Sequence, residues 1–284
     1  MAHKNIPAYL KGTFQDDQNG YHYAYPLPTD VDIVENLRSA DEWMLLVSVL
    51  EHAKRGDFSH LSRLPKVLKN TRDPMIVRGI VDLFGDAGST REFDTLIELM
   101  IYTDDDEFKV DGSRGAQWAG NLLFLPYMLE AMITARSERT RESIGSHISH
   151  LLESQPGELA YQAEIDSVRK YSERVVSQVR RLAKKFGRED APVWEGELFS
   201  VRGLAEKMYE LLTREDDEED YLLGPRFLLL RHRFAANTGI DCRSFYKDRR
   251  FQPLNATAIV REFLDSRASS QYKEGIRYFF GYPI

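Results

Sequence analysis

The sequence predicts an all-α protein that is built in large part from stacked antiparallel helix pairs and closed by a C-terminal helical cap with an extended aromatic tail. Apolar residues recur at spacings of three and four over long stretches, which is the pattern of amphipathic helices. Ser, Asp, Pro and Gly residues mark where these stretches begin and end. Two of the helix pairs begin at Ser39 and Asp73, which lie 34 residues apart, within the period of about 20 to 50 residues that is typical of helical repeats.

The first helix pair is predicted from residue 39 to about residue 68. Ser39 and Glu42 have the spacing of a capping box, and apolar residues follow at helical spacing as far as Leu50. Gly56 is expected to end this helix, and Asp57 is expected to cap the next one. Two helices joined by so short a turn form an antiparallel hairpin.

The second pair begins at Asp73, predicted as the N-cap, with Pro74 in the first helical position, where a missing N–H costs nothing. The segment from Gly85 to Gly88 is expected to break this helix before a second one that carries Phe93 to Met100. The stretch RDPMIVRGIVDLFGDAGSTREFDTLIELM resembles a HEAT repeat. The matching residues are Asp73, Pro74, Val77, Arg78 and Gly85, with Phe84 where the family usually has Leu. The resemblance implies that Arg78 pairs with an Asp between neighbouring repeats.

Residues 103–115 are expected to form a loop because they combine an acidic run with two glycines. Helices are predicted to resume over 116–135 and 138–153, and a long helix or a helix pair over 158–187. The last of these ends in basic residues, which complement a helix C-terminus. The basic residues are Arg180, Arg181, Lys184, Lys185 and Arg188.

Three regions follow from this pattern. Residues 1–38 form an N-terminal arm with a short helix, residues 39–187 form the HEAT-like repeats, and residues 188–284 form a C-terminal helical cap region. In the last region, helices are expected over 199–212 and 221–236, followed by a short helix capped by Asn255. An aromatic tail that folds back is one way to cover the apolar face of a last repeat.

Composition narrows the classes of function. The formal net charge of −7 argues against general nucleic-acid binding and is compatible with a basic partner or with solubility alone. The single cysteine, Cys242, cannot form an intrachain disulfide, and the N-terminus lacks the apolar core of a signal peptide. The apolar run from Leu122 to Ile133 is far shorter than the roughly 20 residues of a membrane span. We therefore expect a cytoplasmic protein that does not bind membranes.

Signatures of catalysis are missing from the sequence. It has no GxxxxGK[ST], GxGxxG, HExxH, CxxC or GxSxG motif. His147 and His150 have the spacing of a metal-binding pair on a helix, but His147 borders an apolar stripe, so one core and one surface histidine is the favoured interpretation. Cys242 has no histidine beside it in sequence, although His232 could approach it in space, and a buried free cysteine is the favoured reading. We expect no enzyme, no cofactor and no metal.

Two acidic runs are the most unusual local features. They comprise Asp104, Asp105, Asp106 and Glu107, and then Asp216, Asp217, Glu218, Glu219 and Asp220 after Glu215. Like charges packed so closely belong on exposed segments, either as solvated loops or caps, or as a landing site for a basic protein. The first run lacks the spacing of a calcium loop. These nine residues are the candidate partner-binding residues.

The last part of the chain carries a second resemblance. Residues 234–246, 251–256 and 275–281 resemble the C-terminal region of HEAT-like bacterial proteins that accompany polymorphic or contact-dependent toxins as immunity proteins. The resemblance implies that the chain binds a cognate toxin domain and blocks it. The alternatives are a general HEAT-type scaffold or adaptor, and a nucleic-acid enzyme on a helical-repeat stack, which would need a basic groove. The sequence does not indicate the oligomeric state.

Overall fold

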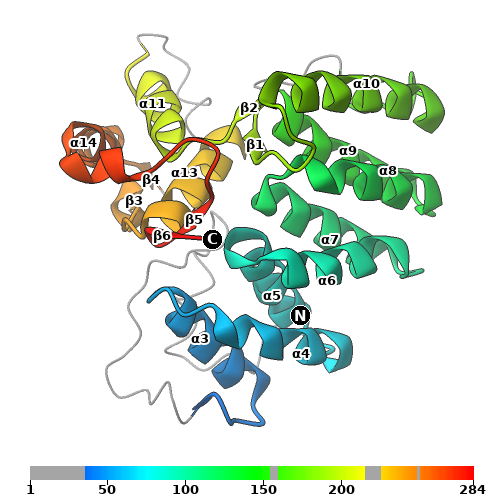
Figure 1. Ribbon diagram of the computed structural model, residues 1–284, viewed down its shortest axis with the longest axis horizontal. Coiled ribbons are helices and arrows are strands. Elements are labelled where there is room, and N and C mark those ends of the chain that lie inside the picture. Colours follow the sequence, from blue (N-terminus) through cyan, green and yellow to red (C-terminus); the bar gives the residue numbers. More distant parts are fainter. Residues whose placement is uncertain (1–35, 154–158, 215–224, 248–249) are drawn as a thin grey trace. The chain divides into compact units, whose positions relative to one another are not determined.

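Figure 1 shows the computed structural model, which describes residues 36–153, 159–214, 225–247 and 250–284. The protein is mostly helical, so the predicted all-α class is confirmed. The strands among the described residues are each two residues long, and they form three two-stranded antiparallel hairpins. The predicted N-terminal arm lies outside the described residues, except for its last three, and so does the acidic run 215–220.

The chain forms two compact units. Unit 1 combines the residues up to Asp57 with those from Ser200 onward, and unit 2 comprises Phe58–Phe199. The predicted division into 1–38, 39–187 and 188–284 stays a prediction.

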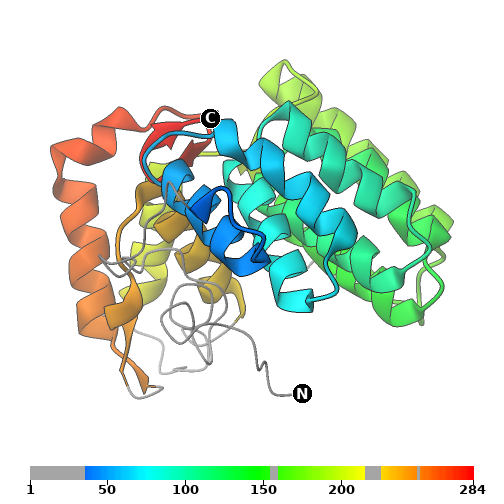
Figure 2. The same ribbon diagram turned by 90° about the horizontal axis from the view of Figure 1, so that it is seen from below.

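Unit 2 is a succession of helices that ends in a small hairpin. Its elements are η1 (Ser59–Arg63), α4 (Leu64–Asn70), α5 (Pro74–Ala87), α6 (Thr90–Ile101), α7 (Asp106–Ala119), η2 (Leu122–Phe124), α8 (Leu125–Thr134), α9 (Glu138–Leu152), α10 (Val168–Phe186), β1 (Val193–Trp194) and β2 (Glu197–Leu198). Helices two apart in sequence pack together: α5 with α7, α7 with α9, α6 with α8, and α8 with α10. Figures 1 and 2 show these helices, coloured from cyan to yellow-green, lying side by side.

The helix starts in unit 2 follow the expected capping chemistry. Asp73 is the N-cap of α5 and accepts a hydrogen bond from the Met75 amide, with Pro74 behind it as predicted. A capping box that we did not predict joins Ser89 and Glu92 at the start of α6. Each such cap satisfies an amide that the helix itself leaves without a partner.

The loop predicted at 103–115 is wrong, because most of it forms α7. The two glycines are there for packing: a Cβ on Gly115 would lie 2.7 Å from Leu96 and 3.0 Å from the carbonyl oxygen of Val81. Gly85 does not end α5 either, since the helix continues to Ala87. A Cβ on Gly85 would lie 2.4 Å from the Gly115 carbonyl oxygen, so α5 and α7 cross with their backbones almost in contact.

The continuous helix predicted over 116–135 is also wrong. Its first part is the end of α7, which stops at Gly120 in the left-handed conformation. The chain then makes the short η2 turn, started by the Asn121 side chain, and α8 begins with Pro126 in its first turn. The sequence did not reveal this break because residues 122–133 are almost continuously apolar.

Among the residues that the structure describes, unit 1 contains helix α3 from the N-terminal part of the chain and helices of the C-terminal region. Its elements are α3 (Glu42–Ala53), α11 (Val201–Leu212), α13 (Pro225–Thr238), η3 (Arg243–Phe245), β3 (Tyr246–Lys247), β4 (Arg250–Phe251), α14 (Pro253–Asp265), η4 (Arg267–Gln271), β5 (Tyr278–Phe279) and β6 (Tyr282–Pro283). Helix α11 packs against both α13 and α14. Here the predicted capping box at Ser39 is wrong, because Asp41 caps α3. Asn255 lies inside α14, and its amide donates to the Ser244 carbonyl oxygen instead of capping the helix.

The aromatic tail folds onto α13. The amides of Phe280 and Gly281 donate to the carbonyl oxygens of Ala236 and Asn237, which are free because the helix ends there. A row of rings runs from Phe234 through Phe263, Tyr272 and Tyr278, with neighbouring centroids 4.9 to 5.7 Å apart. The tail also meets the end of α3, where Lys54 lies over the Phe280 ring and Gly56 leaves room for Tyr282.

Within the part of the chain that the structure describes, no helix combines the length and apolar character needed to cross a membrane.

Candidate functional site

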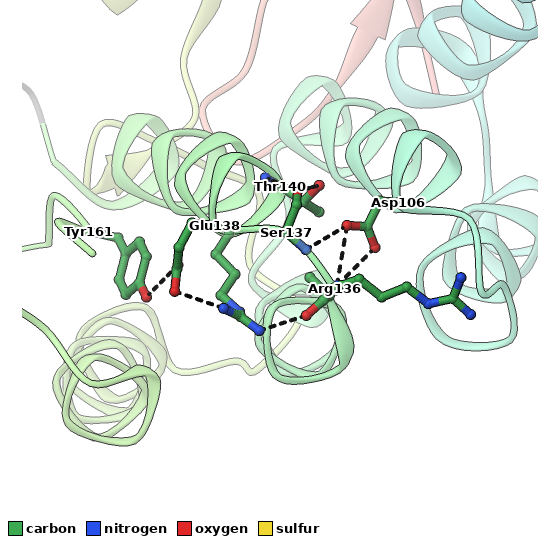
Figure 3. A network of polar contacts seen from close by, with 8 residues as sticks. Asp106, Arg136, Ser137, Glu138, Thr140 and Tyr161 are labelled. Carbon is green, nitrogen blue, oxygen red and sulfur yellow. Dashed lines mark hydrogen bonds and ion pairs between the residues drawn. The ribbon is translucent and has the colours of Figure 1, made fainter. Parts of the chain in front are cut away.

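The first acidic run, Asp104 to Glu107, surrounds the start of α7. Asp105 is the N-cap and accepts a hydrogen bond from the Glu107 amide at 2.9 Å. Asp106 accepts hydrogen bonds from the amides of Arg136 and Ser137, at the start of α9, at 3.1 and 2.9 Å (Figure 3). Burial raises the pKa of Asp106, but these hydrogen bonds outweigh it and bring the pKa below its usual value.

These contacts divide the run by role. Asp105 and Asp106 satisfy amides at the starts of two helices, so their charges are matched by local dipoles. Asp104 is 96% exposed and lies 3.6 Å from the guanidinium of Arg136, and Glu107 is exposed as well. Asp104 and Glu107 are therefore the members best placed to face a partner, and their predicted binding role stays a prediction. Asp216, Asp217, Glu218, Glu219 and Asp220 lie outside the described residues.

A buried ion pair links α5 to α7. Asp82, which is 1% exposed, accepts hydrogen bonds from Arg114 Nε at 2.8 Å and from the Trp118 indole N–H at 3.1 Å. Arg114 also donates to Asp111 at 2.6 Å. Burial opposes the charge of Arg114, but the two carboxylates raise its pKa above the usual value. The resemblance implied that Arg78 pairs with an Asp between repeats, and this stays a prediction. The charge of Arg78 acts on Asp111 of α7, which also accepts a hydrogen bond from Arg114.

His147 and His150 on α9 are both half-buried, and His147 lies against α7. His147 Nδ1 lies 2.7 Å from the Ser113 hydroxyl of α7. Burial, reinforced by the positive charge of Arg114, lowers the pKa of His147 to about 3, so the ring is neutral at pH 7. A neutral imidazole that pairs with a hydroxyl between two helices is a packing group, in keeping with the core position expected for it.

Cys242 is buried in unit 1. Burial raises the pKa of its thiol to about 12, although the charge of Arg231 acts in the opposite direction. The thiolate needed for nucleophilic attack or metal binding is therefore disfavoured. Its sulfur lies 3.5 Å from the Ile240 carbonyl oxygen, as expected for a small packed side chain that donates weakly.

A groove along the seam of α8 and α10 is an open feature that the sequence did not indicate. It has two hollows of about 800 and 280 Å³, which share Val176 and Arg180 in their walls. Its floor is apolar, and two large side chains there face solvent: Ile133 is 55% exposed and Leu123 is 39% exposed. The residues that line the floor are Leu123, Leu129, Ile133, Val168, Val176, Val179 and Ala183.

The rim of this groove, which we call the α8–α10 groove, is basic. Arg141, Arg169 and Arg180 border it, and Glu173 and Glu189 are its acidic members. Arg141 is held in place because it donates to Glu138 and to the Ala135 carbonyl oxygen; Glu138 also lies in the network of Figure 3. An apolar floor with a charged rim is the usual make-up of a protein-docking surface.

The sequence of α10 has one feature that is consistent with this groove. On α10 the residues Tyr171, Val175 and Leu182 form one buried stripe. Val168, Val176, Val179 and Ala183 form a second stripe beside it, which is only half-buried. The apolar arc of the helix is thus wider than its own packing needs, a feature that helical spacing alone does not distinguish from ordinary amphipathicity.

Comparison with protein-family models, with curated proteins and with solved structures finds no match to this chain.

Proposed function

We propose that this chain is a protein-binding module that neutralises a partner protein, as an immunity protein neutralises its cognate toxin. The observation that carries the proposal is the open α8–α10 groove, whose exposed apolar residues and basic rim lie on well-packed helices. Apolar side chains that face solvent in a continuous groove mark interaction surfaces more often than they mark chance exposure.

The packing of unit 2 supports a preformed surface. Contacts between helices two apart in sequence are the arrangement of stacked helical repeats, and this favours the HEAT-like solenoid inferred from Asp73, Pro74 and Val77. A rigid stack loses little conformational entropy when a partner binds, so more of the contact energy appears as affinity. In this proposal the protein acts in the cytoplasm of a bacterial cell during competition between cells.

The test uses the product of the adjacent gene. Cells that express that product are grown with and without this chain, and the two purified proteins are mixed and passed through a sizing column. We expect growth to be rescued, a stoichiometric complex to form, and the activity of the partner to fall to the background at a molar ratio of about one. Full activity of the partner in the presence of an excess of this chain would contradict the proposal.

A scaffold or adaptor is the second candidate, because an open groove of this make-up can hold a partner protein without inhibiting it. A scaffold holds two partners at once and leaves their activities intact. The mixing experiment separates the two cases: a ternary complex with undiminished activity favours a scaffold, and a binary complex with lost activity favours an immunity protein.

A further inference from the structure

The charge of α10 contrasts with that of the chain around it. The helix contains seven Lys and Arg residues and one Glu, a net charge of +6. Since the whole chain carries −7, the remainder carries −13. An acidic partner is therefore repelled by most of the chain and attracted at α10, so electrostatics alone would guide it to this helix.

Some of these cations are already used within the protein. Arg174 makes two hydrogen bonds to Asp166, at 2.7 and 2.9 Å, and Lys185 lies 2.7 Å from Glu197. Arg180, Arg181 and Lys184 are exposed and form no ion pair with any residue in the described ranges. Arg180 also borders both hollows of the groove, so its charge lies beside the apolar floor.

We propose that the α8–α10 groove is the docking site for an acidic amphipathic helix of the partner protein, an inference that rests on the proposed protein-binding function. The floor takes the apolar face of that helix, and its flanking Asp and Glu residues meet Arg180 first. Arg141 and Arg169 add positive charge to the rim, although Arg141 already pairs with Glu138 and Arg169 already pairs with Glu173 at 3.2 Å. This is the helix-in-groove mode of recognition, in which anchors at i, i+3 or i+4, and i+7 enter an apolar channel.

The length of the groove sets the length of its ligand. The floor extends along α10 from Val168 to Ala183. At a rise of about 1.5 Å per residue, this distance is roughly 22 Å, which matches a partner helix of about four turns. Such a helix places three or four apolar anchors on the floor.

A nucleic acid fits the same charges less well. Its affinity comes from phosphates that meet exposed cations, and it has no continuous apolar surface to cover residues such as Ile133, Val176 and Val179. Aromatic platforms for stacking bases are also missing from the described lining of the groove. The floor therefore favours a protein helix over a nucleic acid.

The test uses three labelled probes with the full chain, measured by fluorescence anisotropy at low and at physiological salt. The first probe is a 16-residue peptide with Leu at helical spacing and flanking Glu residues. The second has the same Leu residues with Lys in place of Glu, and the third is single-stranded oligothymidine. We expect the acidic peptide to bind at least about tenfold more tightly than the other two, with an affinity that falls as salt rises.

Two variants place the binding site in the groove. Ile133→Asp puts a charge on the floor and Arg180→Glu reverses the rim; both residues are exposed, so the fold is expected to remain intact. Each is expected to weaken binding of the acidic peptide about tenfold. The matched controls are Tyr102→Asp and Arg91→Glu, which change exposed residues on or next to α6 that do not line the groove, and they are expected to leave affinity within about twofold.

Several results would overturn the inference. Equal binding of the acidic and basic peptides, or unchanged affinity in Ile133→Asp, would remove the role of the groove. If oligothymidine binds more tightly than the acidic peptide and its binding depends on Arg180, then α10 is a nucleic-acid-binding helix. Concentration-dependent dimers that Ile133→Asp abolishes would make a second copy of this chain the occupant.

This test and the test of the proposed function fail separately. If the adjacent gene product is neutralised equally well by the wild type and by both groove variants, the function stands and the groove is not its site. If that product is not bound at all, the function fails, while the peptide measurements still decide what the groove recognises.

Discussion

Replacement of Asp82 by Ala is the most informative change to the core of unit 2. Asp82 is 1% exposed and is the acceptor for both Arg114 Nε and the Trp118 indole N–H. Without the Asp82 carboxylate, the Arg114 guanidinium between α5 and α7 keeps only its ion pair with Asp111. The Trp118 indole N–H loses the acceptor that it has in the wild type. Breaking a buried ion pair from one side costs about 3 to 5 kcal/mol, because the remaining charge stays buried.

Two features of the site place the expected loss at the lower end of that range. Asp111 still accepts a bond from Arg114 at 2.6 Å, and the Arg114 side chain is 15% exposed, so water can reach it in part. We expect Asp82→Ala to lower the free energy of unfolding of unit 2 by about 3 kcal/mol. With a urea m-value near 3 kcal/mol/M, this corresponds to a midpoint lower by about 1 M.

Urea titrations followed by tryptophan fluorescence report this transition, since Trp118 and Trp194 both lie in unit 2. A variant with Asp82→Leu and Arg114→Met removes both charges and serves as the comparison. It is expected to recover most of the loss, because no guanidinium is left buried without Asp82, and the Asp111 carboxylate that loses Arg114 is 22% exposed and still feels the charge of Arg78. A loss below about 1 kcal/mol in Asp82→Ala, or a double variant as unstable as the sum of its single changes, would refute the reasoning.

Three further changes test other parts of the structure. His147 has a pKa of about 3 in the folded protein against about 6.5 when unfolded, so the unfolded chain binds more protons between these values and stability falls as pH decreases through that window. Between pH 7 and pH 5 this amounts to at most about 2 kcal/mol, and unfolding of His147→Gln should show a correspondingly flatter pH dependence; an equal slope would contradict the assignment. Asp106→Ala removes the acceptor for two amides at the start of α9 and should cost about 1 kcal/mol, whereas Asp104→Ala, at a side chain that is 96% exposed, should cost close to nothing. Because the Asp106 pKa is lowered in the fold, its contribution is present above the unfolded pKa near 4 and is lost as pH falls through the folded value. Gly115→Ala should destabilise by about 1 to 2 kcal/mol through overpacking against Val81 and Leu96, while Gly203→Ala on α11, where a Cβ meets nothing closer than 3.4 Å, should stabilise by up to about 1 kcal/mol; thermal melts that rank the two the other way would contradict the close crossing of α5 and α7.

The elements that the sequence predicted well are those with local signals. Asp73 and Pro74 place the start of α5 because an N-cap and an N1 proline act within a single turn. Helix α7 was missed because its acidic start and its glycines have the composition of a loop. The acidic residues are favourable at a helix start. Gly115 is required because Val81 and Leu96 of two other helices leave no room for a side chain, and such contacts between distant segments cannot be seen in local composition.

The acidic runs and the α8–α10 groove differ in how far the sequence reveals them. Charge patterning selected the acidic runs, and Asp105 and Asp106 proved to be bound to nearby amides. Helix α10 has two apolar stripes, and the α8–α10 groove exists because the packing of its neighbours buries only one of them fully. The sequence does not show which stripe is buried, so Val176 and Val179 could not be distinguished from core residues.

The discontinuity of unit 1 has a consequence for how the chain folds during synthesis. Helices in unit 2 contact neighbours close in sequence, so that unit can assemble stepwise as the chain emerges from the ribosome. Unit 1 joins the end of α3 to a tail more than two hundred residues later, where Lys54 lies over Phe280 and Gly56 receives Tyr282. The contacts that Lys54 and Gly56 make with the tail therefore form only after the last residues are made. A nascent chain stalled before the tail is the form in which we expect chaperone dependence and aggregation to be greatest.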